Sequence, residues 1–121
     1  MAEDLKNVRL SQKATDIADT IMESGFFDDK ISIAKFALAY AVKYHRDDID
    51  PEALDSVYEA NGSNYNIGSI DEDKFLSGLI QAIYPGTTTP YRYIRVLMIY
   101  GLERLGELLD QGRLYPINQW L

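Results

Sequence analysis

The chain has 121 residues, 46% of them hydrophobic, and contains no cysteine. This length and composition predict one folded domain with a substantial core and argue against intrinsic disorder. The lack of cysteine excludes disulfide bonds, a thiolate nucleophile and a Cys-ligated zinc site.

The net charge of −7 is unevenly distributed along the chain. Residues 1–46 hold seven Lys or Arg and seven Asp or Glu, whereas residues 47–121 hold five against twelve. Because contacts between basic side chains and phosphates dominate affinity for nucleic acids, we expect any DNA-binding surface in the first part. No apolar run reaches the roughly 18–20 residues of a membrane span, and no signal peptide is recognisable. We therefore expect a cytoplasmic protein that makes no membrane contact.

The first 46 residues are predicted to form a strand and two helices. Val8 and Leu10 alternate with polar residues, as in a short half-buried strand. Ser11 is a suitable N-cap for the first helix, and Gly25 is placed to end that helix. Residues 31–44 form a second helix whose apolar face is broad enough for a central position or an oligomer interface.

Helices are also predicted for most of the second part. Asp50 and Pro51 begin a short helix that extends to about residue 59. Residues 61–69 are rich in turn formers and are expected to be a loop. A third substantial helix ends near Ile83, and a long last helix extends from Pro90 to about residue 110.

These elements predict a mainly α, compact helical domain with at most one short N-terminal strand. Residues 1–121 form a single domain, in which a strand-helix-helix unit over 5–46 precedes a helical hairpin within 50–112. Gly78, Gly101 and Gly106 lie inside the last two helices, where each costs about 1 kcal/mol relative to Ala. We expect these glycines to permit close packing of the two helices, with Gly101 buried against the apolar stripe of residues 75–83.

No catalytic motif is recognisable, so we expect a non-enzymatic protein without cofactor or metal. His45 is the only histidine and is expected to be solvated at a helix end. The acidic residues from Asp47 to Glu59 lack the spacing of a calcium loop. They are expected to form a solvated linker and the start of a helix.

Six residues are candidates for contact with DNA. Arg92 and Arg95 lie in the first turns of the last helix, where they could hold a phosphate or a carboxylate. The structural alternative is an ion pair with nearby acids such as those at 71–73. Exposed side chains of the predicted strand could read a major groove if the strand paired with a second copy. The candidates are Asn7, Arg9, Lys13, Lys35, Arg92 and Arg95.

A family resemblance supports the link to DNA. Val8-Arg9-Leu10-Ser11-x-x-Ala14, Gly25 and Ala34-x-x-Ala37-Leu38-Ala39-Tyr40-Ala41 resemble the start of ribbon-helix-helix proteins. More specifically, they resemble the small DndE-type proteins of bacterial DNA phosphorothioation. Similar spacing continues through Asn66-Ile67-Gly68-x-x-Asp71 and Ile99-Tyr100-Gly101-Leu102-x-x-Leu105. Where those proteins have His-x-x-Arg-Gly, this chain has Tyr100-Gly101-Leu102-Glu103-Arg104-Leu105.

The resemblance implies a non-catalytic accessory protein of bacterial DNA modification or defence machinery. Such a protein would contact DNA weakly and without sequence preference, or contact a DNA-processing partner, and we expect a homo-oligomer. One alternative is a ribbon-helix-helix regulator that binds an operator as a dimer. Another is a protein-interaction adaptor whose acidic second half meets a basic partner. The sequence leaves the partner, the oligomeric state and any DNA preference open.

Overall fold

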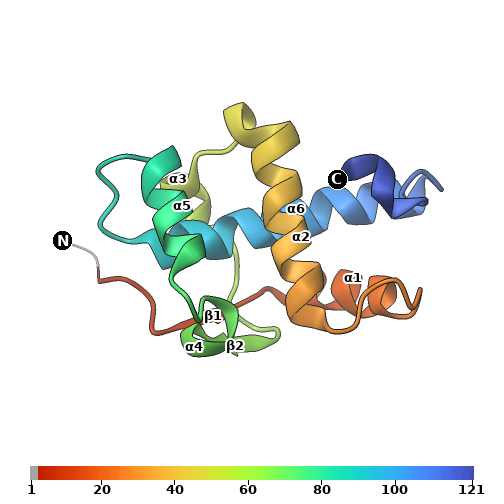
Figure 1. Ribbon diagram of the computed structural model, residues 1–121, viewed down its shortest axis with the longest axis horizontal. Helices are drawn as coiled ribbons and strands as arrows, with labels where there is room; N and C mark the ends of the chain where they lie inside the picture. The colour runs from red at the N-terminus through yellow and green to blue at the C-terminus, as the bar shows by residue number, and fades with distance from the viewer. Residues whose placement is uncertain (1–2) are drawn as a thin grey trace.

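Helices make up most of the chain in the computed structural model, which describes residues 3–121 (Figure 1). The mainly α class with a short N-terminal strand is thereby confirmed. In chain order the elements are β1 (Asn7–Arg9), α1 (Gln12–Met22), α2 (Lys30–His45), η1 (Arg46–Asp48), α3 (Pro51–Asp55), β2 (Asn64–Asn66), α4 (Ile67–Ile70), α5 (Phe75–Ile83), α6 (Pro90–Asp110) and η2 (Ile117–Trp120).

Side-chain caps begin α1, α2 and α3. The Ser11 hydroxyl accepts a hydrogen bond from the Ala14 N–H at 3.1 Å, and an Asp29 carboxylate oxygen accepts one from the Ser32 N–H at 2.8 Å. Asp50 caps α3 in the same way. Such caps satisfy backbone donors that have no partner within the helix. Local sequence therefore determines the starts of α1, α2 and α3.

The N-terminal strand pairs within its own chain. β1 and β2 are antiparallel, with Val8 opposite Tyr65 and Arg9 opposite Asn64. The prediction of a loop over 61–69 is therefore wrong for Asn64–Asn66, which form a strand, and for the residues after them, which begin α4 (Ile67–Ile70). The local composition favoured a turn, but the edge of β1 supplies hydrogen-bond partners that only the folded chain brings near.

The long helix α6 lies at the centre of the fold, and α2 crosses it (Figure 1). Gly101 is buried at this crossing, where an added Cβ would collide with the backbone carbonyl of Ala37. Burial of Gly101 is as expected, but the prediction that it faces residues 75–83 is wrong. At Gly106, an added Cβ would instead meet the side chain of Ile17 on α1.

Helix α5 is less buried than its apolar stripe predicted. Leu76 and Ile80 are buried against the core, whereas 65% of Phe75 is exposed. An added Cβ at Gly78 would meet no atom within 4 Å. The prediction that glycines bring α5 and α6 into close contact is therefore wrong. Instead, Gly101 of α6 allows the close approach of α2, and Gly106 allows that of α1.

One hydrophobic core joins residues from both parts of the chain. Leu10 and Ala14 enter it from the first part, and Leu97 and Leu102 enter it from α6. No helix within residues 3–121 has the length and apolar character needed to cross a membrane. The broad apolar face of α2 is covered mainly by α6, which explains its width.

Candidate functional site

Arg95, a predicted DNA contact, is buried within the protein. Only 5% of the residue is exposed, and its Nε donates a hydrogen bond to the Arg9 carbonyl at 2.6 Å. Its two Nη atoms donate to the Tyr58 carbonyl at 2.8 Å and to Asp55 at 3.4–3.5 Å. Burial lowers the pKa of Arg95, and the Asp55 carboxylate opposes this effect. These acceptors occupy the guanidinium, so Arg95 is unavailable for a phosphate.

Arg92 and the start of α6 hold carboxylates from the same chain. The Asp4 carboxylate accepts hydrogen bonds from the backbone N–H groups of Tyr91 and Arg92, each at 3.1 Å. Arg92 Nη1 lies 3.1 Å from an Asp55 oxygen, in an ion pair. The structural alternative, an ion pair, is thus the one observed, but the partner is Asp55 rather than an acid from 71–73.

The other four candidates do not gather on one surface. Asn7 and Arg9 are exposed on β1, and Arg9 Nη1 donates a hydrogen bond to the Gly62 carbonyl at 3.0 Å. Lys13 lies on α1 beside acidic residues of α6. Lys35 lies on α2, at the edge of a different groove. The structure therefore shows no continuous basic stripe made by the six predicted residues.

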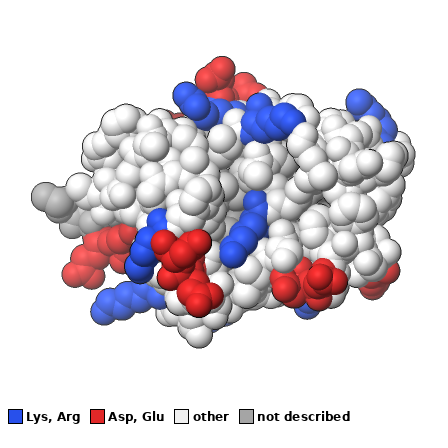
Figure 2. Space-filling model, in the orientation of Figure 1, with Lys and Arg blue, Asp and Glu red and all other residues white. Residues whose placement is uncertain are grey.

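Lys35 lines a candidate site, a groove of about 450 Å³ between α2 and α5. Its surface is mainly apolar, and Figure 2 shows this face of the molecule as largely uncharged. The exposed Phe75 ring lies at its α5 side. The residues that line it are Lys35, Leu38, Ala39, Val42, Lys43, Ile70, Asp71, Asp73, Phe75, Leu76 and Leu79.

Charges of opposite sign stand on the two sides of this α2–α5 groove. Lys35 and Lys43 project from α2, while Asp71 and Asp73 precede α5. Burial raises the pKa of Asp71, but hydrogen bonds from the Tyr91 hydroxyl and from backbone N–H groups outweigh it, so the pKa is lowered. Asp71 is thus held by the fold. Lys43 Nζ donates a hydrogen bond to a Leu121 oxygen at 2.5 Å, so Lys35 is the lysine of α2 that is left for a ligand in this groove.

Residue spacing in the sequence indicates the α2 side of this groove. Lys35, Ala39 and Lys43 recur at intervals of four, which places them on one stripe of a helix. Phe75 and Leu79 follow the same interval on α5, but their spacing in an apolar stripe predicts a buried face. Only the packing of α2 on α6 shows which stripe stays uncovered.

His45 occupies a more enclosed position than expected. Its ring lies between the rings of Tyr40 and Tyr100, with centroid distances of 5.4 and 5.7 Å. Its Nδ1 is 3.7 Å from an Asp48 oxygen. The predicted helix-end position is correct, because His45 is the last residue of α2. The predicted solvation is wrong, because aromatic residues of α2 and α6 converge on the ring and leave it half-buried. Over residues 3–121, no cluster of three His, Asp or Glu is arranged to bind a metal.

Comparison of the chain with protein-family models, curated proteins and solved structures finds no match.

Proposed function

We propose that this chain is a non-catalytic accessory protein of bacterial DNA modification or defence machinery, and that it binds a DNA-processing partner protein in the cytoplasm. The observation that carries the proposal is the α2–α5 groove, which is mainly apolar and has two lysines on its α2 side and two aspartates on its α5 side. The link to DNA modification rests on the resemblance of residues 8–41 to DndE-type proteins.

An amphipathic helix is the partner element that fits this groove best. Apolar side chains at helical spacing would cover Leu38, Val42 and Leu79, as in other helix-in-groove complexes. An acidic residue on the flank of that helix would face Lys35. Such rim charges mainly direct the encounter and its orientation, while the apolar contacts supply most of the affinity.

Partner binding is favoured over direct DNA contact by the positions of the basic residues. Arg95 is buried, and Arg92 is paired with Asp55. Asn7, Arg9, Lys13 and Lys35 remain exposed, so any DNA contact by this chain is weak and insensitive to sequence. The regulator alternative gains no support from β1, because β1 pairs with β2 of the same chain.

A complementation experiment tests the proposal in a bacterium that carries this gene beside phosphorothioation genes. We expect deletion to reduce the phosphorothioate content of chromosomal DNA, measured by mass spectrometry after nuclease digestion. Wild type should restore it, whereas Phe75→Glu should not, because the charge disrupts the apolar groove. Val57→Glu is the matched control, since Val57 is also 65% exposed but does not line the groove.

Two results would overturn this assignment. Unchanged phosphorothioate content after deletion would show that the protein is not an accessory of DNA phosphorothioation. Full complementation by Phe75→Glu would show that the α2–α5 groove is not needed for this function. Circular dichroism melts of the two Glu variants should agree within about 2–4 °C, since surface substitutions change stability little.

A further inference from the structure

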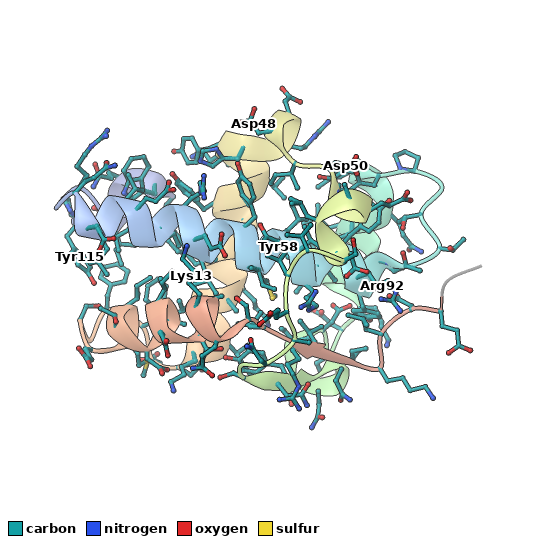
Figure 3. All side chains as sticks on the ribbon, turned by 180° about the vertical axis from the view of Figure 1, so that it is seen from behind. Lys13, Asp48, Asp50, Tyr58, Arg92 and Tyr115 are labelled. Atoms are coloured by element: carbon teal, nitrogen blue, oxygen red, sulfur yellow. The ribbon has the colours of Figure 1, made fainter. Side chains whose placement is uncertain are left out.

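A second groove, between α1 and α6, is predominantly acidic. It measures about 530 Å³ and is lined by Lys13, Asp16, Ile17, Thr20, Glu103, Gly106, Glu107, Leu109 and Asp110. Figure 3, which views the molecule from behind, shows Lys13 between α1 and α6. This α1–α6 groove therefore lies on the opposite face of the molecule from the α2–α5 groove.

The two walls of the α1–α6 groove each follow a single helical stripe. Residues 13, 16, 17 and 20 of α1 and residues 103, 106, 107 and 110 of α6 share the spacing i, i+3, i+4, i+7, which defines one helix face. The floor is apolar, with half-buried Ile17 and Leu109 beside Gly106. Gly106 keeps the helices close, since an added Cβ would displace Ile17.

Four carboxylates and one lysine surround this floor. Glu107 is paired with Arg104 at 3.1 Å. Within the part of the chain that the structure describes, Asp16, Glu103 and Asp110 take part in no ion pair. The groove thus presents unneutralised negative charge above an apolar floor.

We infer that the α1–α6 groove binds a basic amphipathic helix of a partner protein. Its apolar stripe covers Ile17 and Leu109, and its Lys or Arg side chains face Glu103 and Asp110. Nucleic acid is a poor occupant, because its phosphates would be repelled by the same carboxylates. The inference is independent of the proposed function, which uses the opposite face and a partner of opposite charge.

A labelled synthetic peptide tests this inference by fluorescence anisotropy. The probe is a helix-forming peptide of about 18 residues, ~27 Å long, with Leu along one stripe and Lys elsewhere. We expect the double variant Glu103→Gln, Asp110→Asn to weaken binding about tenfold at low salt, because two facing charges are lost. The matched control Asp28→Asn, Asp47→Asn makes the same charge change outside the groove. It should weaken binding less than twofold.

Two further measurements separate a groove from general charge attraction. Replacing the Leu stripe of the probe with Ser should weaken binding at least tenfold, because the apolar floor is no longer covered. Lys13→Gln should strengthen binding of the Leu/Lys probe, because it removes the one positive charge in the groove. Circular dichroism of the double variant establishes that it is folded.

Several outcomes overturn the inference. These are equal losses in the two double variants, equal affinity for the Leu and Ser probes, or no binding of the Leu/Lys probe. Binding of a short DNA duplex that Lys13→Gln abolishes would assign the groove to nucleic acid instead.

Discussion

At the scale of single residues, Arg95 and Asp71 contribute charge to the fold rather than to a ligand. Arg95 links β1 to the segment after α3 through backbone carbonyls of Arg9 and Tyr58. Asp71 is 2% exposed and joins the start of α5 to Tyr91 of α6. A buried charge requires several hydrogen bonds to be stable, and both groups have them.

Arg95→Lys should destabilise the protein by about 3 kcal/mol, despite conserving the charge. A single ammonium group cannot reach the acceptors that the planar guanidinium spans, which leaves buried groups unpaired. Arg92→Lys is the control and should cost less than about 1 kcal/mol, because its pair with Asp55 is partly exposed. Urea unfolding of both variants measures the difference. Equal losses would contradict the structural role of Arg95.

Asp71→Asn should lower the free energy of unfolding by about 1–3 kcal/mol at neutral pH, because the amide cannot replace the carboxylate as acceptor. The lowered pKa of Asp71 means that the folded state favours the ionised form. Its contribution is therefore present above the unfolded-state pKa of roughly 4 and is lost as pH falls through the folded-state pKa.

Denaturant titrations from pH 7 to pH 3 check this pH dependence. The advantage of wild type over Asp71→Asn should shrink toward the acidic end. Asp73→Asn is the control, since Asp73 is exposed and accepts one hydrogen bond, from the Phe75 N–H. A stability difference for Asp71→Asn that stays constant with pH would contradict the role of the carboxylate.

At the scale of helices, the two mid-helix glycines at 78 and 101 should respond to Ala in opposite directions. Gly101→Ala places a Cβ against the carbonyl of Ala37, and backbone atoms cannot move aside cheaply. We expect a loss of about 1–3 kcal/mol from overpacking, at the higher end because the neighbour is backbone. Gly78→Ala meets no atom within 4 Å and should gain up to about 1 kcal/mol from helix propensity.

Thermal melts of the two Ala variants provide the measurement, and each variant is the control for the other. A gain in melting temperature for Gly101→Ala would show that α2 and α6 are less closely packed than described. A loss for Gly78→Ala would mean that α5 has a neighbour at that position.

At the scale of the whole molecule, the uneven charge of the sequence becomes a difference between two faces. Two lysines and two aspartates stand on opposite sides of the α2–α5 groove, whereas four carboxylates and one lysine line the α1–α6 groove. If both proposals hold, we expect the chain to bind an acidic partner helix and a basic one at the same time. The net charge of −7 favours association with basic partners and weakens any contact with DNA.

Local sequence by itself determined where α1, α2, α3 and α6 start. Ser11, Asp29, Asp50 and Pro90 act within one turn of chain, so capping and proline geometry fix where the helices begin. The α6 stripe and its bounds were predictable for the same reason, since a long periodic pattern has few alternatives. The spacing of Lys35 and Lys43 in the sequence also predicts that they lie on one stripe of α2.

Only the tertiary structure decided which surfaces stay uncovered and which charges stay free. Gly101 faces Ala37 rather than α5, because helix crossing depends on side chains distant in sequence. β2 forms because the edge of β1 is near, and Arg95 is buried because the carbonyls of Arg9 and Tyr58 converge on it. A basic residue near a helix start binds either a ligand or acceptor groups of the same chain. The difference lies in acceptors that folding brings together, and the sequence does not show their distances.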